Sequence, residues 1–100
     1  MDVIFLVSGE TGDYSDHQDW RVRAFVSREL AEQFCEQVNS WLVLNKVHRT
    51  KTHDDDRLGY KEREALKCPF DNAFSCDYTG TSYFIEEVPY DHLAALVNEP

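Results

Sequence analysis

The stretch Val3–Val26, VIFLVSGETGDYSDHQDWRVRAFV, decides the fold of this chain. It begins with five consecutive apolar residues, Val3–Val7, a pattern typical of a strand that is buried on both faces. Ser8 and Gly9 are expected to end this strand, and the loop after them is rich in glycine, aspartate and serine, which favour turns. From Trp20 to Val26 apolar and polar residues alternate, which predicts a half-buried strand. We therefore expect two antiparallel strands joined by a loop of about ten residues, Glu10–Asp19, long enough to be a binding site.

A long amphipathic helix is expected directly after the second strand. Ser27 is a good N-cap, and Glu29 suits the first turn because an acid there favours the helix dipole. Apolar residues then recur at helical spacing as far as about Leu44, and we expect Leu30, Phe34 and Trp41 to face the sheet. The predicted apolar stripe consists of Leu30, Ala31, Phe34, Cys35, Val38, Trp41 and Leu42.

The second half of the chain is harder to predict. A polar stretch follows the long helix, and Asp54–Asp56 could cap a short helix at roughly Arg57–Lys67. Tyr83–Val88 is predicted to be a third strand, which Pro89 ends, and Asp91 could cap a last helical turn through His92–Val97. The element order ββα, insertion, β predicts an α+β fold in one domain, residues 1–100. In this fold a small antiparallel sheet carries one main amphipathic helix on one face, and the insertion is a polar helix.

The negative net charge is the most pronounced feature of the composition. Nineteen acidic residues against ten basic ones give a net charge of −9, and residues 68–100 contain six acids and no base. Such a surface repels nucleic acid and anionic membranes and attracts basic patches on proteins. We expect the small basic stretch with Lys46, Arg49 and Lys51 to pair with acids of the same chain. No apolar run approaches the ~20 residues of a membrane span, and the first residues suit a strand better than a signal peptide.

No group of residues in the sequence predicts catalysis or metal binding. Ser15, Asp16 and His17 have the residue types of a hydrolase triad, but the side chains of consecutive residues diverge. Asp13, Ser15, His17 and Asp19 resemble a calcium loop that lacks its glycine and its last glutamate. Cys68, Cys76, His48 and His53 lack the spacing of a zinc site, and three cysteines, an odd number, argue for reduced thiols and the cytoplasm. We therefore predict no enzymatic activity, no cofactor and no metal.

Three segments carry a family resemblance: FLVSGETGDYSDH, the helix start SRELAEQF, and DYTGTSYFIEEVP. Together they resemble a family of small phage-encoded proteins with a strand, an "SGxYSDY"-like loop, a second strand, a helix and a "YxIEEVP"-like strand. Here the loop is longer, and His17 stands where tyrosine is usual. The resemblance does not extend over residues 45–67. It implies a phage or prophage origin and a fold, but no chemistry.

Two classes of function fit these features. In the first, the protein is an acidic inhibitor that binds a host nucleic-acid-handling defence complex, of the anti-CRISPR or anti-restriction type, and its carboxylates mimic phosphates. In the second, it is an accessory module that binds a protein through a sheet edge, and its charge only confers solubility. Both predict a protein partner in the host cytoplasm, no direct contact with nucleic acid or membrane, and a monomer or homodimer. The partner-binding residues expected for the inhibitor are Glu10, Asp13, Tyr14, Asp16, Asp19 and Trp20 on the loop, and Asp77, Glu86, Glu87 and Asp91 in the last third.

Overall fold

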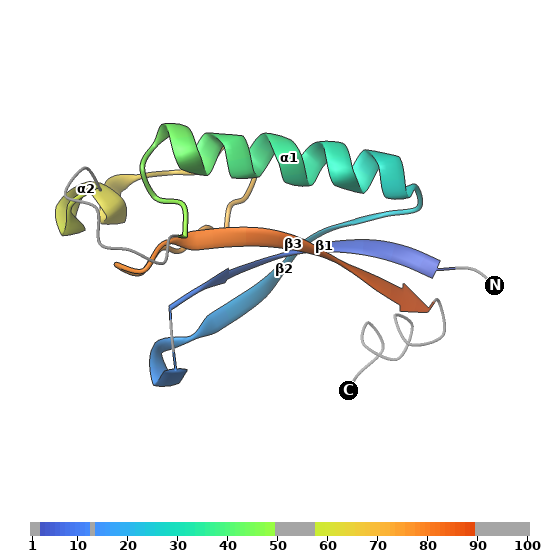
Figure 1. Cartoon of the computed structure of the whole chain (residues 1–100), viewed down its shortest axis with the longest axis horizontal. Coiled ribbons are helices and arrows are strands. Elements are labelled where there is room, and N and C mark those ends of the chain that lie inside the picture. The colour runs from blue at the N-terminus through green and yellow to red at the C-terminus, as the bar shows by residue number, and fades with distance from the viewer. Residues whose placement is uncertain (1–2, 13, 50–57, 90–100) are drawn as a thin grey trace.

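The computed structural model of the chain describes residues 3–12, 14–49 and 58–89. It consists of a three-stranded antiparallel sheet in the order β2-β1-β3, with one long helix lying across one face (Figure 1). This arrangement confirms the predicted α+β fold. The elements are β1 (Val3–Thr11), the 3-10 turn η1 (Tyr14–Asp16), β2 (Gln18–Phe25), α1 (Arg28–Leu44), α2 (Tyr60–Ala65) and β3 (Thr81–Pro89).

The first strand is longer than predicted. Ser8 and Gly9 do not end it, because β1 is the central strand and pairs with β2 on one side and β3 on the other as far as Thr11. Gly9 is required for a different reason. A Cβ there would lie 2.7 Å from the Trp20 ring and 2.9 Å from the Tyr83 ring, so glycine lets the two aromatic side chains cross the central strand. The expected loop Glu10–Asp19 therefore shrinks to the few residues between Thr11 and Gln18.

The alternation predicted for the second strand is interrupted. Val7 is opposite Arg23 and Ser8 is opposite Arg21, so Val22 is an extra residue that forms a β-bulge. An extra residue reverses the faces to which later side chains point. As a result Phe25, and not Val26, reaches the core, where its ring packs 5.5 Å from that of Phe34. The predicted strand is present, but Val26 lies beyond its end and is 82% exposed, so the simple alternation does not continue from Trp20 to Val26.

The long helix has the predicted bounds. Ser27 caps it by accepting a hydrogen bond from the backbone N–H of Leu30 at 3.4 Å. The residues that it buries are Ala31, Phe34, Val38 and Leu42, at the i, i+3, i+4 spacing of one helix face. Leu30 lies about 100° around the helix from Ala31 and is 51% exposed, so the expectation that Leu30 faces the sheet is wrong.

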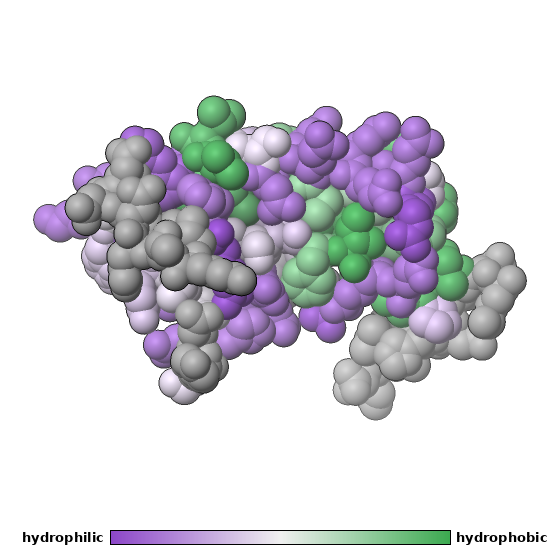
Figure 2. Space-filling view, in the orientation of Figure 1, coloured by the Kyte–Doolittle hydropathy of each residue, from purple (hydrophilic) through white to green (hydrophobic). Residues whose placement is uncertain are grey.

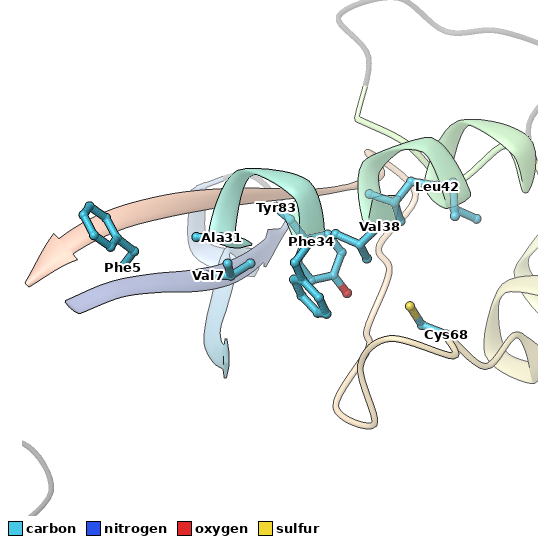
Figure 3. Packing of buried hydrophobic residues seen from close by; sticks show 9 residues of the cluster. Phe5, Val7, Ala31, Phe34, Val38, Leu42, Cys68 and Tyr83 are labelled. Atoms are coloured by element: carbon cyan, nitrogen blue, oxygen red, sulfur yellow. The ribbon is translucent and has the colours of Figure 1, made fainter. Parts of the chain in front are cut away.

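The core lies between α1 and the sheet. Val7 of β1 and Tyr83 of β3 lie next to Phe34 and Val38 of α1, as Figure 3 shows, and Phe5 belongs to the same cluster nearer the start of β1. Val47, just after α1, is fully buried in the same cluster, and its carbonyl accepts a hydrogen bond from the N–H of Thr81 at 2.9 Å. Residues 47–49 therefore cover the start of the outer edge of β3.

The remaining predictions concern the insertion and the end of the chain. Helix α2 is shorter than the predicted Arg57–Lys67, and its N-cap is Gly59, which supplies no side-chain hydrogen bond. The proposed cap at 54–56 and the last helical turn through His92–Val97 lie outside the described residues. The third strand begins two residues earlier and ends one residue later than predicted.

Candidate functional site

Two loops that are far apart in the sequence meet at one end of the sheet and enclose a polar pocket of about 530 Å³. One loop follows β1 and supplies Asp16 and His17, and the other precedes β3 and supplies Cys76 and Asp77. The structure thus brings one predicted acid of the first loop and one of the last third to the same pocket. The full lining is Thr11, Ser15, Asp16, His17, Gln18, Ser75, Cys76 and Asp77.

Thr11, at the end of β1, holds the two loops together. Its buried hydroxyl donates to the carbonyl of Gly80 at 2.8 Å and accepts from the backbone N–H of Asp77 at 2.8 Å. Gly12 then turns the chain with a positive φ of 83°, and a Cβ at this position would lie 2.3 Å from the carbonyl oxygen of Asp16. Only glycine fits there, so the sequence Thr11-Gly12 specifies the pocket wall locally.

The two acids of the pocket differ in their surroundings. Asp16 is exposed, whereas Oδ2 of Asp77 is buried and, among the described residues, has no hydrogen-bond partner. In the part of the chain that the structure describes, no ion pair joins either carboxylate to a basic side chain. Asp16 is therefore accessible to a cation from outside the chain, whereas one oxygen of Asp77 is shielded from solvent.

Three other predicted acids pair with bases of the same chain. Glu10 accepts from Arg49 Nη1 at 3.0 Å, which confirms that Arg49 of the basic stretch pairs with an internal acid, and its other oxygen lies 3.5 Å from His17 Nε2. Asp19 lies 3.4 Å from Arg21. Glu87 pairs with Arg28 at the start of α1.

Glu86 and Glu87 point to opposite faces of β3, as their adjacency predicts. Glu87 lies on the α1 side, where it meets Arg28. Glu86 is opposite Leu6 of the central strand, on the other face, and has no ion pair among the described residues. Asp13 and Asp91 lie outside the described residues, and of Tyr14 only the backbone, in η1, is described.

Trp20 and Asp71 form a buried network that the sequence did not reveal. Asp71, 6% exposed, accepts hydrogen bonds from Trp20 Nε1 at 2.8 Å, from the Tyr83 hydroxyl at 2.7 Å and from the N–H of Ala73 at 2.9 Å. Trp20 was expected to be a partner-binding residue, and the structure gives its indole this internal role. Asp71 is one of the six acids of the last third, and its burial removes it from the acidic surface.

The three cysteines, Cys35, Cys68 and Cys76, are thiols. Burial raises the pKa of the Cys35 and Cys68 thiols, which lowers the fraction of reactive thiolate at neutral pH. Among residues 3–12, 14–49 and 58–89, no three His, Cys, Asp or Glu side chains are placed to hold a metal ion. In the same part of the chain, no helix is long and apolar enough to cross a membrane.

Comparison of the chain with protein-family models, with curated proteins and with solved structures finds no match.

Proposed function

We propose that this protein is a non-enzymatic inhibitor that binds a basic surface of a host nucleic-acid-handling defence complex, of the anti-CRISPR or anti-restriction type. The observation that carries the proposal is the pocket where Asp16 and Asp77 converge without a basic partner among the described residues. Carboxylates held in this way take the place of phosphates and accept hydrogen bonds from lysine and arginine side chains of the partner.

The other predicted acids differ in how firmly a basic side chain of the same chain holds them. The Asp19–Arg21 and Arg28–Glu87 pairs are about half exposed. Exposed pairs of this kind contribute only about 0–1 kcal/mol, so a cation of the partner can replace the internal one at little cost. The Glu10–Arg49 pair is less accessible, with side chains 31% and 28% exposed, and Arg49 also donates to the carbonyl of Gly12 at 2.8 Å. Glu10 is therefore held by Arg49 beside the pocket, whereas the exposed Asp16 makes the first contact with the partner and Asp77 lies next to it in the pocket.

The net charge of −9 supports the same proposal. A strongly acidic protein approaches a basic groove quickly because long-range attraction steers the encounter, and this attraction weakens as salt is added. The inhibitor acts in the cytoplasm of the host cell as a monomer or homodimer, without a cofactor, and it does not contact nucleic acid. A phage origin, which the sequence resemblance implies, fits an inhibitor of host defence.

The second candidate function is an accessory module that binds a protein through a sheet edge. The outer edge of β2 favours it, because no other strand of the described residues pairs with that edge. However, this edge carries Arg21, Arg23 and the bulge at Val22, which are features that natural proteins use to prevent edge pairing. The electrostatic proposal does not depend on an edge and is therefore preferred.

The experiment that tests the proposal starts with a pull-down from host lysate, followed by mass spectrometry. Affinity for the captured complex is then measured at two salt concentrations. The wild type is compared with Asp16→Lys combined with Asp19→Lys, and with Glu62→Lys, which reverses a charge on α2 outside the pocket. We expect the double variant to associate more slowly while Glu62→Lys changes little, and we expect wild-type affinity to fall with salt. Affinity that is flat with salt and equal in all three proteins would favour the sheet-edge module.

A further inference from the structure

A second surface, on the outer side of α1, has the chemistry of a docking groove. Figure 2 shows a hydrophobic area over the C-terminal end of α1, where Val43 is 56% and Leu44 is 81% exposed. Next to it lies an open groove of about 550 Å³, in which Trp41, Leu44 and Phe70 supply apolar surface and Gln33, Glu36 and Gln37 supply polar surface. This volume accommodates a large apolar side chain.

The aromatic rings of the groove are held in place by the core. Phe70 packs edge-on against the buried Phe34, with ring centroids 6.1 Å apart, and Trp41 packs edge-on against Phe74 at 5.3 Å. Because both rings have fixed neighbours beneath them, little side-chain freedom is lost when a ligand covers them. The groove is therefore already formed in the unbound protein.

The charges beside the groove indicate what binds there. The exposed charges of α1 are Arg28, Glu29, Glu32 and Glu36, and Arg28 is already paired with Glu87 and Glu32. The helix surface is thus acidic along its first half and apolar at its end. A second copy of this chain would bring equal acidic surfaces together, and nucleic acid would meet the same repulsion. A segment that carries basic residues beside a large apolar side chain complements both parts of the surface.

We propose that the outer side of α1 binds a basic amphipathic helix of a partner protein, whose apolar side chain enters the groove between Trp41, Leu44 and Phe70. Helices of this type bind apolar grooves through one row of side chains while their flanking charges set orientation. The surface is separate from the Asp16–Asp77 pocket, because the two share no lining residue. Peptide binding at this surface therefore does not depend on the inhibitor proposal.

The test uses a synthetic amphipathic helical peptide of leucine and lysine and records nitrogen–proton spectra of the full-length protein during titration. The two tryptophans supply an internal comparison, since Trp41 lies in the groove and the Trp20 indole N–H is bonded to Asp71. We expect the Trp41 indole signal and the amides of Gln33, Gln37 and Phe70 to shift and the Trp20 indole signal to stay. A peptide of the same composition with its leucines scattered around the helix is expected to bind much more weakly.

Two pairs of variants separate docking from general charge attraction. Leu44→Ser should weaken peptide binding by about tenfold, because one large apolar contact is lost. Val26→Ser, which removes an equally exposed apolar side chain at the start of α1, should leave binding unchanged. Glu36→Lys should weaken binding more than Glu62→Lys, although both change the net charge equally.

Three outcomes would overturn the docking proposal. The first is no binding of the peptide, and the second is shifts spread over all acidic surfaces with equal loss in both members of each pair. The third is self-association of the free protein that Leu44→Ser abolishes, because the groove would then be an interface between copies. Circular dichroism spectra of the four variants check that each is folded, and all four positions are exposed.

Discussion

The side-chain amide of Asn39 bonds both backbone groups of Tyr83. Asn39 Nδ2 donates to the carbonyl of Tyr83 at 3.2 Å, and the N–H of Tyr83 donates to Asn39 Oδ1 at 3.1 Å. A helix side chain thus takes the place that a neighbouring strand would occupy beside β3. Together with residues 47–49, which bond Thr81, it covers the outer edge of β3 over its first three residues and ties α1 to the sheet.

Replacing Asn39 by leucine should therefore destabilise the fold. The N–H of Tyr83 loses its partner in a partly buried place, and its carbonyl keeps only the weak thiol donor of Cys35 at 3.4 Å. We expect the free energy of unfolding to fall by about 1–3 kcal/mol. Urea denaturation of the variant and of Ser40→Ala, an exposed neighbour on the same helix, checks this. Equal stability of the two variants would mean that water replaces the amide without cost.

Gly9 and Gly59 should respond differently to alanine. At Gly9 the new Cβ meets two ring systems that are packed against each other, Trp20 and Tyr83, whose centroids are 6.4 Å apart. We expect a loss of about 1–3 kcal/mol, as for other overpacked sites. At Gly59 the nearest atom is the end of the flexible Glu62 side chain at 2.6 Å, which can move, so stability should change by less than about 1 kcal/mol. Thermal melts of the two variants make the comparison.

Asp71→Asn should weaken the buried network around Trp20. One oxygen of Asp71 accepts from both Trp20 and Tyr83, and the other accepts from Ala73. An asparagine keeps only one acceptor, so one of these donors loses its partner, and about 1–3 kcal/mol should be lost. Asp16→Asn, at an exposed position, is the control and should unfold like the wild type. Tryptophan fluorescence during urea unfolding provides the measurement.

Phe34→Ala should cost about 3–5 kcal/mol, because the ring is 8% exposed and contacts Phe25 and Phe70. Leu30→Ala, one turn earlier on the same helix, should cost less than about 1 kcal/mol because Leu30 is half exposed. Urea melts of both proteins test which face of α1 is buried. A larger loss for Leu30→Ala would contradict the helix orientation.

Ionisation of the Tyr83 phenol should contribute to a loss of stability in alkaline solution. Burial, and next the hydrogen bond to Asp71, raise the pKa of the Tyr83 phenol above its ordinary value of 10.0. The folded chain therefore keeps a proton that the unfolded chain releases above about pH 10. The contribution of Tyr83 to stability is complete below that pH and declines above it, by up to about 1.4 kcal/mol per pH unit. Between about pH 10 and pH 11, the free energy of unfolding of Tyr83→Phe should therefore decline less steeply than that of the wild type. Unfolding free energies of the two proteins, measured over this pH range, check this. The raised pKa of the Cys35 thiol acts in the same direction in both proteins and cancels in this comparison. The pKa of the Cys68 thiol depends in part on a hydrogen bond with the Tyr83 side chain, so both proteins are compared with Cys68→Ala in the background.

The elements that depend on local patterns were predictable from the amino-acid sequence. The apolar run at Val3–Val7 predicted where β1 begins, and the N-cap Ser27 with the helical spacing of Phe34 and Val38 predicted α1, because hydrogen-bond geometry and side-chain periodicity act over a few residues. The opposite directions of Glu86 and Glu87 followed from the same period of two. The acidic bias was also visible, since charge is a property of composition.

Which of these residues come together depends on strand pairing and packing between distant parts of the chain. The bulge at Val22 depends on register with β1, so no pattern within β2 showed that Phe25 and not Val26 would reach the core. Asp71 looked like one more surface acid until the fold placed two donors, from β2 and β3, against it. Asp16 and Asp77 are 61 positions apart, and they share a pocket because the Thr11 hydroxyl, at the end of β1, bonds the backbone of Asp77 and Gly80 in the second loop. Such contacts depend on strand pairing between distant segments, which local sequence does not encode.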